Sequence, residues 1–150
     1  MKIPLKYGLL ITLGAIVWVV VAHLLVPDPR SPVHSFGGGI FFNILHIAGI
    51  YLAIRSLKNE AGGELVFKAG MKTGIATAFV YALSFCLFFV IALFAVGTKL
   101  MASEPDAENL PLWRMALGAF VGLFLGSLLF GLIYSALISF FLAKRRGVTN

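Results

Sequence analysis

Residues 112–143 read LWRMALGAFVGLFLGSLLFGLIYSALISFFLA, and this stretch decides the fold of the chain. It is apolar throughout apart from Arg114 near its start, and Lys144-Arg145-Arg146 closes it. At about 1.5 Å per residue, a helix over this stretch is roughly 45–50 Å long and exceeds the ~30 Å hydrocarbon layer of a bilayer. The stretch therefore predicts a membrane-spanning helix.

Two ladders of small residues run along this predicted helix. The first ladder consists of Gly118, Gly122 and Gly126, and the second of Ser127, Gly131, Ser135 and Ser139. A spacing of four residues places each ladder on one face, and the two faces differ. Because lipid provides no hydrophobic drive for helix association, close backbone approach at small residues must hold helices together. The ladders therefore predict helix contacts, within the chain or with another copy, although glycine is also common in membrane helices generally.

The composition of the whole chain predicts one membrane-embedded domain over residues 1–150. Apolar residues make up 60% of the 150 residues, and the mean hydropathy is +0.99. Soluble domains are about half apolar, so this excess cannot be buried in a globular core. The net charge of +6 belongs to residues at the ends of apolar runs, and we expect no nucleic-acid partner. The lone Cys86 excludes an internal disulfide and a multi-cysteine metal site.

Three further apolar runs precede the first one quoted, and together they predict an all-α integral membrane protein. The four expected spans are residues 7–26, 36–57, 73–98 and 112–143. Spans joined by short connections cross in alternating directions, which predicts an up-down bundle. In the polar segment between the second and third spans, Gly62-Gly63 predicts a turn, and the residues from Glu64 onward are expected to form a helix lying at or entering the membrane interface.

Basic residues divide unequally between the two ends of the predicted bundle. One side carries nine of them, namely Lys2, Lys6, Arg55, Lys58, Lys68, Lys72, Lys144, Arg145 and Arg146. The other side carries three, namely Arg30, Lys99 and Arg114. The positive-inside rule then predicts that the side with nine basic residues, and with both termini, faces the cytoplasm.

The expected spans offer little reactive chemistry. Away from the helix ends they contain no Asp, Glu, Lys or Arg, which ion-coupled pumps and proton relays need at membrane depth. No pattern fits a catalytic triad or a metal site, so we expect neither an enzyme nor a bound metal. His23 and His46 differ in expected depth by roughly 10 Å, and His34 lies in a loop. Two axial ligands for one haem are therefore not available, and no cofactor is expected.

Asn43 and His46 are the strongly polar side chains that lie deepest in any expected span. They are three residues apart and share a helix face, and an unpaired polar group in hydrocarbon costs several kcal/mol. This face is therefore predicted to turn inward, toward a stripe of the third span that carries Thr77, Tyr81 and Ser84. Two interpretations stand: a hydrogen-bonded contact that fixes helix register, or a polar pocket for a quinone, a lipid head group or another small ligand.

Short motifs recur where the expected spans begin and end. They are Leu5-Lys6-Tyr7-Gly8, Ile54-Arg55 leading into Gly62-Gly63-Glu64, Phe67-Lys68-Ala69-Gly70 through Gly74, and a glycine-rich last span that ends in Lys144-Arg145. In these motifs the chain resembles, over nearly its whole length, a bacterial family of short four-span membrane proteins, domain-of-unknown-function family 4199. The resemblance implies a four-span architecture and a bacterial inner membrane, and it implies no catalytic residues.

The sequence favours a structural or regulatory membrane protein that packs through its small-residue faces. The expected partners are membrane lipids and either another copy of the chain or a larger membrane complex. The alternative is a protein that binds or transports a lipid or small molecule in a pocket between the second and third spans. A dry bundle with an exposed glycine ladder favours the first reading, and a pocket open to lipid or water favours the second.

Overall fold

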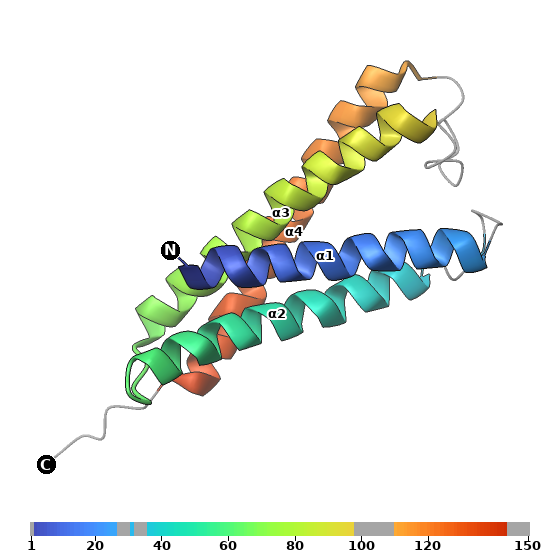
Figure 1. The fold of residues 1–150 in the computed structure, drawn as a ribbon. Coiled ribbons are helices and arrows are strands. Elements are labelled where there is room, and N and C mark those ends of the chain that lie inside the picture. The colour runs from blue at the N-terminus through green and yellow to red at the C-terminus, as the bar shows by residue number, and fades with distance from the viewer. Residues whose placement is uncertain (1, 27–30, 32–35, 98–109, 144–150) are drawn as a thin grey trace, which may run out of the picture.

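The computed structural model consists of four long α-helices in the order α1 (Lys2–Leu25), α2 (Gly38–Glu60), α3 (Phe67–Val96) and α4 (Leu112–Leu142) (Figure 1). The structure describes residues 2–26, 31, 36–97 and 110–143. All four helices are long and apolar enough to cross a membrane, which confirms the all-helical, four-span fold predicted from hydropathy. The chain is thus a multi-pass membrane protein. The proline-rich loop and the basic tail lie outside the described residues.

The start of α3 falls in the segment where the sequence predicts a helix lying at or entering the membrane interface. That segment runs from Glu64 to Lys72, and the third span was expected to follow it from residue 73. In the structure α3 begins at Phe67 and continues without a break, with Lys68 and Lys72 exposed in its first turns. Lysine is a good helix former, and its apolar stem can lie along the helix while its ammonium group reaches water. The expected interface helix and the third span are therefore one continuous helix.

Two glycines make the turn between α2 and α3. Gly62 and Gly63 have φ angles of 69° and 90°, in the left-handed region that L side chains rarely adopt. This geometry lets the Gly63 N–H donate a 2.9 Å hydrogen bond to the carbonyl oxygen of Lys58 in the last turn of α2. The turn brings α3 back beside α2.

The helices form two hairpins, α1 with α2 and α3 with α4, which cross each other (Figure 1). Lys58 near the end of α2 donates a 3.0 Å hydrogen bond from Nζ to the carbonyl oxygen of Leu142 at the end of α4. The starts of α1 and α3 and the last turns of α2 and α4 thus lie toward one end, which we call the basic end. Toward the other end, called the opposite end, the two hairpins diverge (Figure 1).

The buried core is divided among three small clusters rather than gathered in one. The α1–α3 crossing buries Ile11 and Phe85, and Ile50 and Ile54 of α2 pack near the basic end. The third cluster, near the opposite end, consists of buried residues from α3 and α4 alone, namely Leu93, Met115 and Ala116. Most other large apolar side chains are exposed, as expected of a protein whose solvent is lipid.

Candidate functional site

His46 lies where three helices meet. The residue is on α2 and is 4% exposed, and its ring centroid is 4.8 Å from that of Tyr81 on α3 and 5.7 Å from that of Tyr134 on α4. Aromatic rings in tilted or edge-on arrangements at these distances attract each other. The Nε2 atom of His46 is buried and has no hydrogen-bond partner among the described residues. The helix face that carries His46 therefore turns into the bundle.

The partner of Asn43 is Tyr134, a residue that sequence reasoning missed. The Tyr134 hydroxyl donates a 2.5 Å hydrogen bond to Oδ1 of Asn43, and Nδ2 of Asn43 donates to the carbonyl oxygen of Gly39 at 2.8 Å. Tyr134 is the one tyrosine in the last apolar run, and a phenol in a membrane span needs a partner for its hydroxyl. The sequence alone could therefore have indicated that Tyr134 needs a polar partner. The bond links α2 to α4 directly.

Two of the five residues expected at a polar pocket make their hydrogen bonds elsewhere. Thr77 donates to the carbonyl oxygen of Thr73, one turn earlier in α3, at 2.8 Å. Ser84 shares a 2.6 Å hydrogen bond with the hydroxyl of Thr12 on α1. The expected polar stripe of α3 is thus divided, because Tyr81 faces α2 while Ser84 pairs with α1.

The second small-residue ladder of α4 lies against α3. Along the contact, Ser139 lies against Gly70, Ser135 against Gly74, and Gly131 against Ala78. A Cβ atom added at Gly74 would be 2.7 Å from the Cβ atom of Ser135, closer than real Cβ atoms approach. The missing side chains therefore set how closely α3 and α4 approach. Ser127, the first residue of this ladder, is only partly buried.

Gly131 has a second close neighbour besides Ala78. A Cβ atom built on Gly131 would lie 3.4 Å from Nε2 of His46, in addition to overlapping the side chain of Ala78. The imidazole of His46 therefore lies against the backbone of α4, in room that a glycine leaves open. The polar cluster of Asn43, His46, Tyr81 and Tyr134 and the small-residue contact of α3 and α4 meet at this glycine.

The first small-residue ladder of α4 is open. A Cβ atom added at Gly118, Gly122 or Gly126 would meet nothing within 4 Å among the described residues. In the most hydrophobic segment of α4, 11% of the residues are buried inside the molecule, against 28–33% in the other three helices. The packing expected at these glycines is therefore not made within the described part of the chain. We call this surface the open glycine face.

The remaining candidate ligands are scattered. His23 is exposed in the last turn of α1, and His34 lies outside the described residues. Cys86 is a buried free cysteine whose Sγ lies 3.7 Å from the carbonyl oxygen of Phe120. Among the residues that the structure describes, no group of three or more His, Cys, Asp or Glu side chains could hold a metal ion.

One comparison with known proteins gives a match. The family model described as "Protein of unknown function (DUF4199)" matches residues 6–104. The matched region takes in nearly all of α1 together with α2 and α3, and it ends before α4. It is shorter than the nearly full-length likeness expected from the motifs. No curated protein and no solved structure matches the sequence.

Proposed function

Because this chain belongs to the DUF4199 family of unknown function, we propose a role from its geometry: a structural or regulatory membrane protein that assembles through the open glycine face of α4. The observation that carries the proposal is the contrast between the two ladders of one helix. Gly131 and Ser135 lie against α3, whereas Gly118 and Gly122 have nothing within 4 Å among the described residues. The same kind of surface that joins helices within the chain is thus presented outward.

The shape of the open glycine face suits a second membrane helix. Gly118 and Gly122 leave the backbone of α4 accessible, and Leu125 and Leu129, each 59% exposed, continue the same side of the helix. Glycines four residues apart let two backbones come close, and the larger neighbours then pack beside them. A second copy inserted in the same direction can present this face to its own twofold-related equivalent. Self-association is therefore the form of the proposal that we test, and a larger membrane complex would use the same face.

The proposed orientation follows from charge. Six described basic residues lie toward the basic end, namely Lys2, Lys6, Arg55, Lys58, Lys68 and Lys72, and Arg114 lies at the opposite end. The positive-inside rule supports an orientation with the basic end in the cytoplasm. The proposal places the protein in a bacterial inner membrane, as the family resemblance implies.

The proposal is tested by measuring the oligomeric state in a mild detergent and in lipid nanodiscs, by native mass spectrometry. We expect the wild type to form an oligomer and Gly122→Leu to be monomeric with an unchanged melting temperature, because a Cβ atom at Gly122 meets nothing within 4 Å among the described residues. Gly39→Leu is the matched control, since Gly39 on α2 also has nothing within 4 Å among the described residues. A Gly122→Leu protein that assembles as well as the wild type contradicts the proposal.

A second candidate function, binding of a small molecule or lipid between α2 and α3, is favoured by one observation. The Nε2 atom of His46 is buried without a hydrogen-bond partner among the described residues, and a ligand could supply that partner. The imidazole is, however, already packed between Tyr81 and Tyr134. Asn43→Leu combined with His46→Leu tests this function: loss of a co-purifying ligand from a folded protein supports it, and loss of folding supports the role in helix register.

A further inference from the structure

A hollow lies on the outer surface of the bundle between the start of α1 and the first half of α3, at the basic end. Its volume is about 970 Å³. Pro4 and Leu5 of α1 form one side, and α3 forms the other with apolar side chains that include Phe67 and Phe79. Leu5, Phe67 and Phe79 are themselves 41–54% exposed. In a membrane this hollow therefore opens to the acyl chains of the surrounding lipid.

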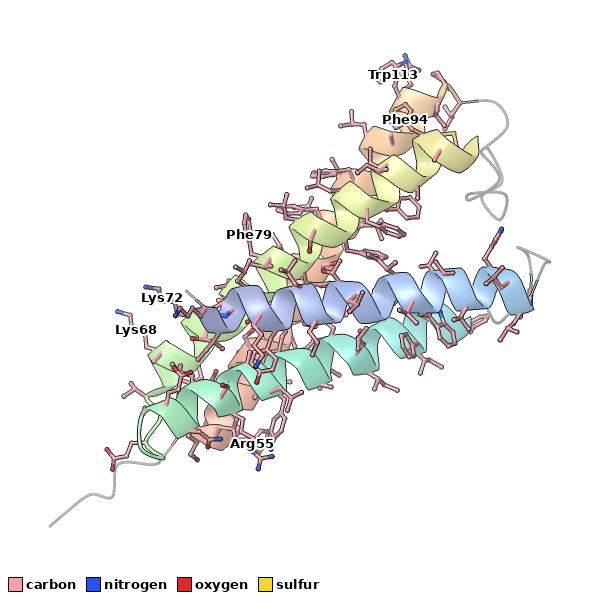
Figure 2. All side chains as sticks on the ribbon, viewed as in Figure 1. Arg55, Lys68, Lys72, Phe79, Phe94 and Trp113 are labelled. Carbon is pink, nitrogen blue, oxygen red and sulfur yellow. The ribbon has the colours of Figure 1, made fainter. Side chains whose placement is uncertain are left out.

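Two lysines line the same hollow. Lys68 and Lys72 are four residues apart, so their side chains leave α3 from neighbouring points of one face. Figure 2 shows both projecting from the side of α3 that also carries Phe79, whereas Arg55 projects from the far side of the bundle. Neither lysine has an ion-pair partner among the described residues. The hollow thus combines an apolar wall with two lysine ammonium groups near the membrane surface.

A second hollow of about 630 Å³ adjoins the first. Pro4, Lys72 and Ala76 belong to the walls of both. Lys2 and Glu60 also line the second hollow. Together with Lys72 they give it two ammonium groups and one carboxylate, so its net charge is positive. A hollow with a net positive charge therefore continues an apolar one, with Lys72 at the boundary.

We propose that these adjoining hollows bind one anionic phospholipid, its acyl chains along the apolar hollow and its phosphate at Lys68 and Lys72. Basic pockets between transmembrane helices on the cytoplasmic side are suited to anionic head groups, and lysine ammonium groups bind phosphate as point charges. The net positive charge selects an anionic over a zwitterionic head group. A second copy of the chain is a poorer occupant of this hollow, because the charged residues at its own basic end are mostly lysine and arginine and would face Lys68 and Lys72 directly. The site lies on α1, α3 and the last turn of α2, and it does not depend on assembly through α4.

The test compares two lipids that share acyl chains, dioleoylphosphatidylglycerol and dioleoylphosphatidylcholine, by titrating each into the purified protein and counting bound lipids by native mass spectrometry. We expect the wild type to prefer the phosphatidylglycerol. Lys68→Gln with Lys72→Gln should weaken its binding about 25-fold, since each lysine near a membrane surface contributes about fivefold. Binding of the phosphatidylcholine should change little.

The matched control is Lys6→Gln with Arg55→Gln. It also removes two charges from the basic end, but neither residue lines either hollow. This control should keep the lipid preference. Equal binding of the two lipids by the wild type would overturn the proposal. An equal loss of phosphatidylglycerol binding in the two double variants would also overturn it, because the lipid would then be attracted to the charged end in general.

The apolar part of the site is tested with Ala76→Phe, which fills the wall that both hollows share. We expect weaker binding of both lipids while the melting temperature of the lipid-free protein shows that it is folded; if the variant does not fold, the lysine variants decide. Full displacement of phosphatidylglycerol by the same concentration of glycerol phosphate would overturn the proposal in favour of a free-phosphate site. A lipid-excluding dimer that forms through this hollow would overturn it in favour of a second copy.

Discussion

Tyr134 on α4 donates a 2.5 Å hydrogen bond to Oδ1 of Asn43 on α2, and both residues lie in the interior of membrane-spanning helices. The two residues belong to different hairpins, so the bond links the α1–α2 hairpin directly to the α3–α4 hairpin. Nδ2 of Asn43 is satisfied separately by the carbonyl oxygen of Gly39 in its own helix. The amide is thereby held with its oxygen toward Tyr134.

The first prediction concerns this bond. Tyr134→Phe keeps the ring against His46 and removes only the hydroxyl, so we expect a loss of about 0.6 kcal/mol, and at most about 1.7 kcal/mol, in the free energy of unfolding. Asn43→Leu combined with Tyr134→Phe should cost less than the sum of the two single changes. Unfolding titrations in mixed micelles measure both quantities. Tyr51→Phe is the control, because Tyr51 is an exposed tyrosine of α2; an equal effect there would contradict the assignment.

The second prediction separates the two ladders of α4 by stability. Gly131→Ala forces a methyl group against Ala78 and His46, and overpacking of this kind typically costs about 1–3 kcal/mol. Gly118→Ala places the same methyl group where nothing lies within 4 Å among the described residues, so its melting temperature should be unchanged or slightly higher. Thermal unfolding of the purified variants measures the difference. Equal effects of the two changes would mean that the contact between α3 and α4 is looser than the structure has it.

The sequence predicted the number of spans well because hydropathy is a local property. Each helix is long and apolar enough on its own to be recognised without knowing its neighbours. The same local reading predicted a helix after Glu64, but it did not show that this helix and the third span are one. The apolar run is interrupted at Lys68 and Lys72, while the helix, whose hydrogen bonds do not depend on hydropathy, continues through them.

The contacts between helices could be predicted only in part. Both ladders of α4 have the same fourfold spacing, and nothing in that spacing says which one faces α3, because the answer depends on how two distant helices cross. Likewise the inward position of His46 follows from the cost of burying a polar group in lipid, whereas the identity of its neighbours does not. Tyr134 was missed because its neighbours in the sequence are aromatic and aliphatic residues, so the segment was treated as an ordinary apolar span.

The third prediction concerns orientation. In a Cys86→Ala background, we expect a cysteine at Leu110 to react with a membrane-impermeant maleimide added to intact cells, and a cysteine at Glu60 to react only after permeabilisation. Both positions are exposed, and they lie at the opposite end and the basic end. Reporter fusions at Asn150 and within residues 104–108 give an independent reading. A fusion at Asn150 that is active only outside the cell would contradict a cytoplasmic basic end.

The fourth prediction concerns the imidazole of His46. Its Nε2 atom is buried without a partner among the described residues, so His46→Leu removes an unsatisfied polar atom, worth about 1–3 kcal/mol. The same change removes ring contacts with Tyr81 and Tyr134 that are worth about 0.5–1.5 kcal/mol each. These effects oppose each other, and we expect the free energy of unfolding to stay within about 1 kcal/mol of the wild type.

The control for this change is His46→Ala, which empties a buried site among three helices and should cost about 2–4 kcal/mol. Unfolding titrations of both variants in the same mixed micelles give the comparison. If His46→Leu costs as much as His46→Ala, the imidazole makes a contact that leucine cannot replace, and the prediction of an unsatisfied Nε2 atom is wrong. If His46→Leu is as stable as the wild type, the prediction holds, and a co-purifying ligand that the folded variant loses would assign the imidazole to ligand binding.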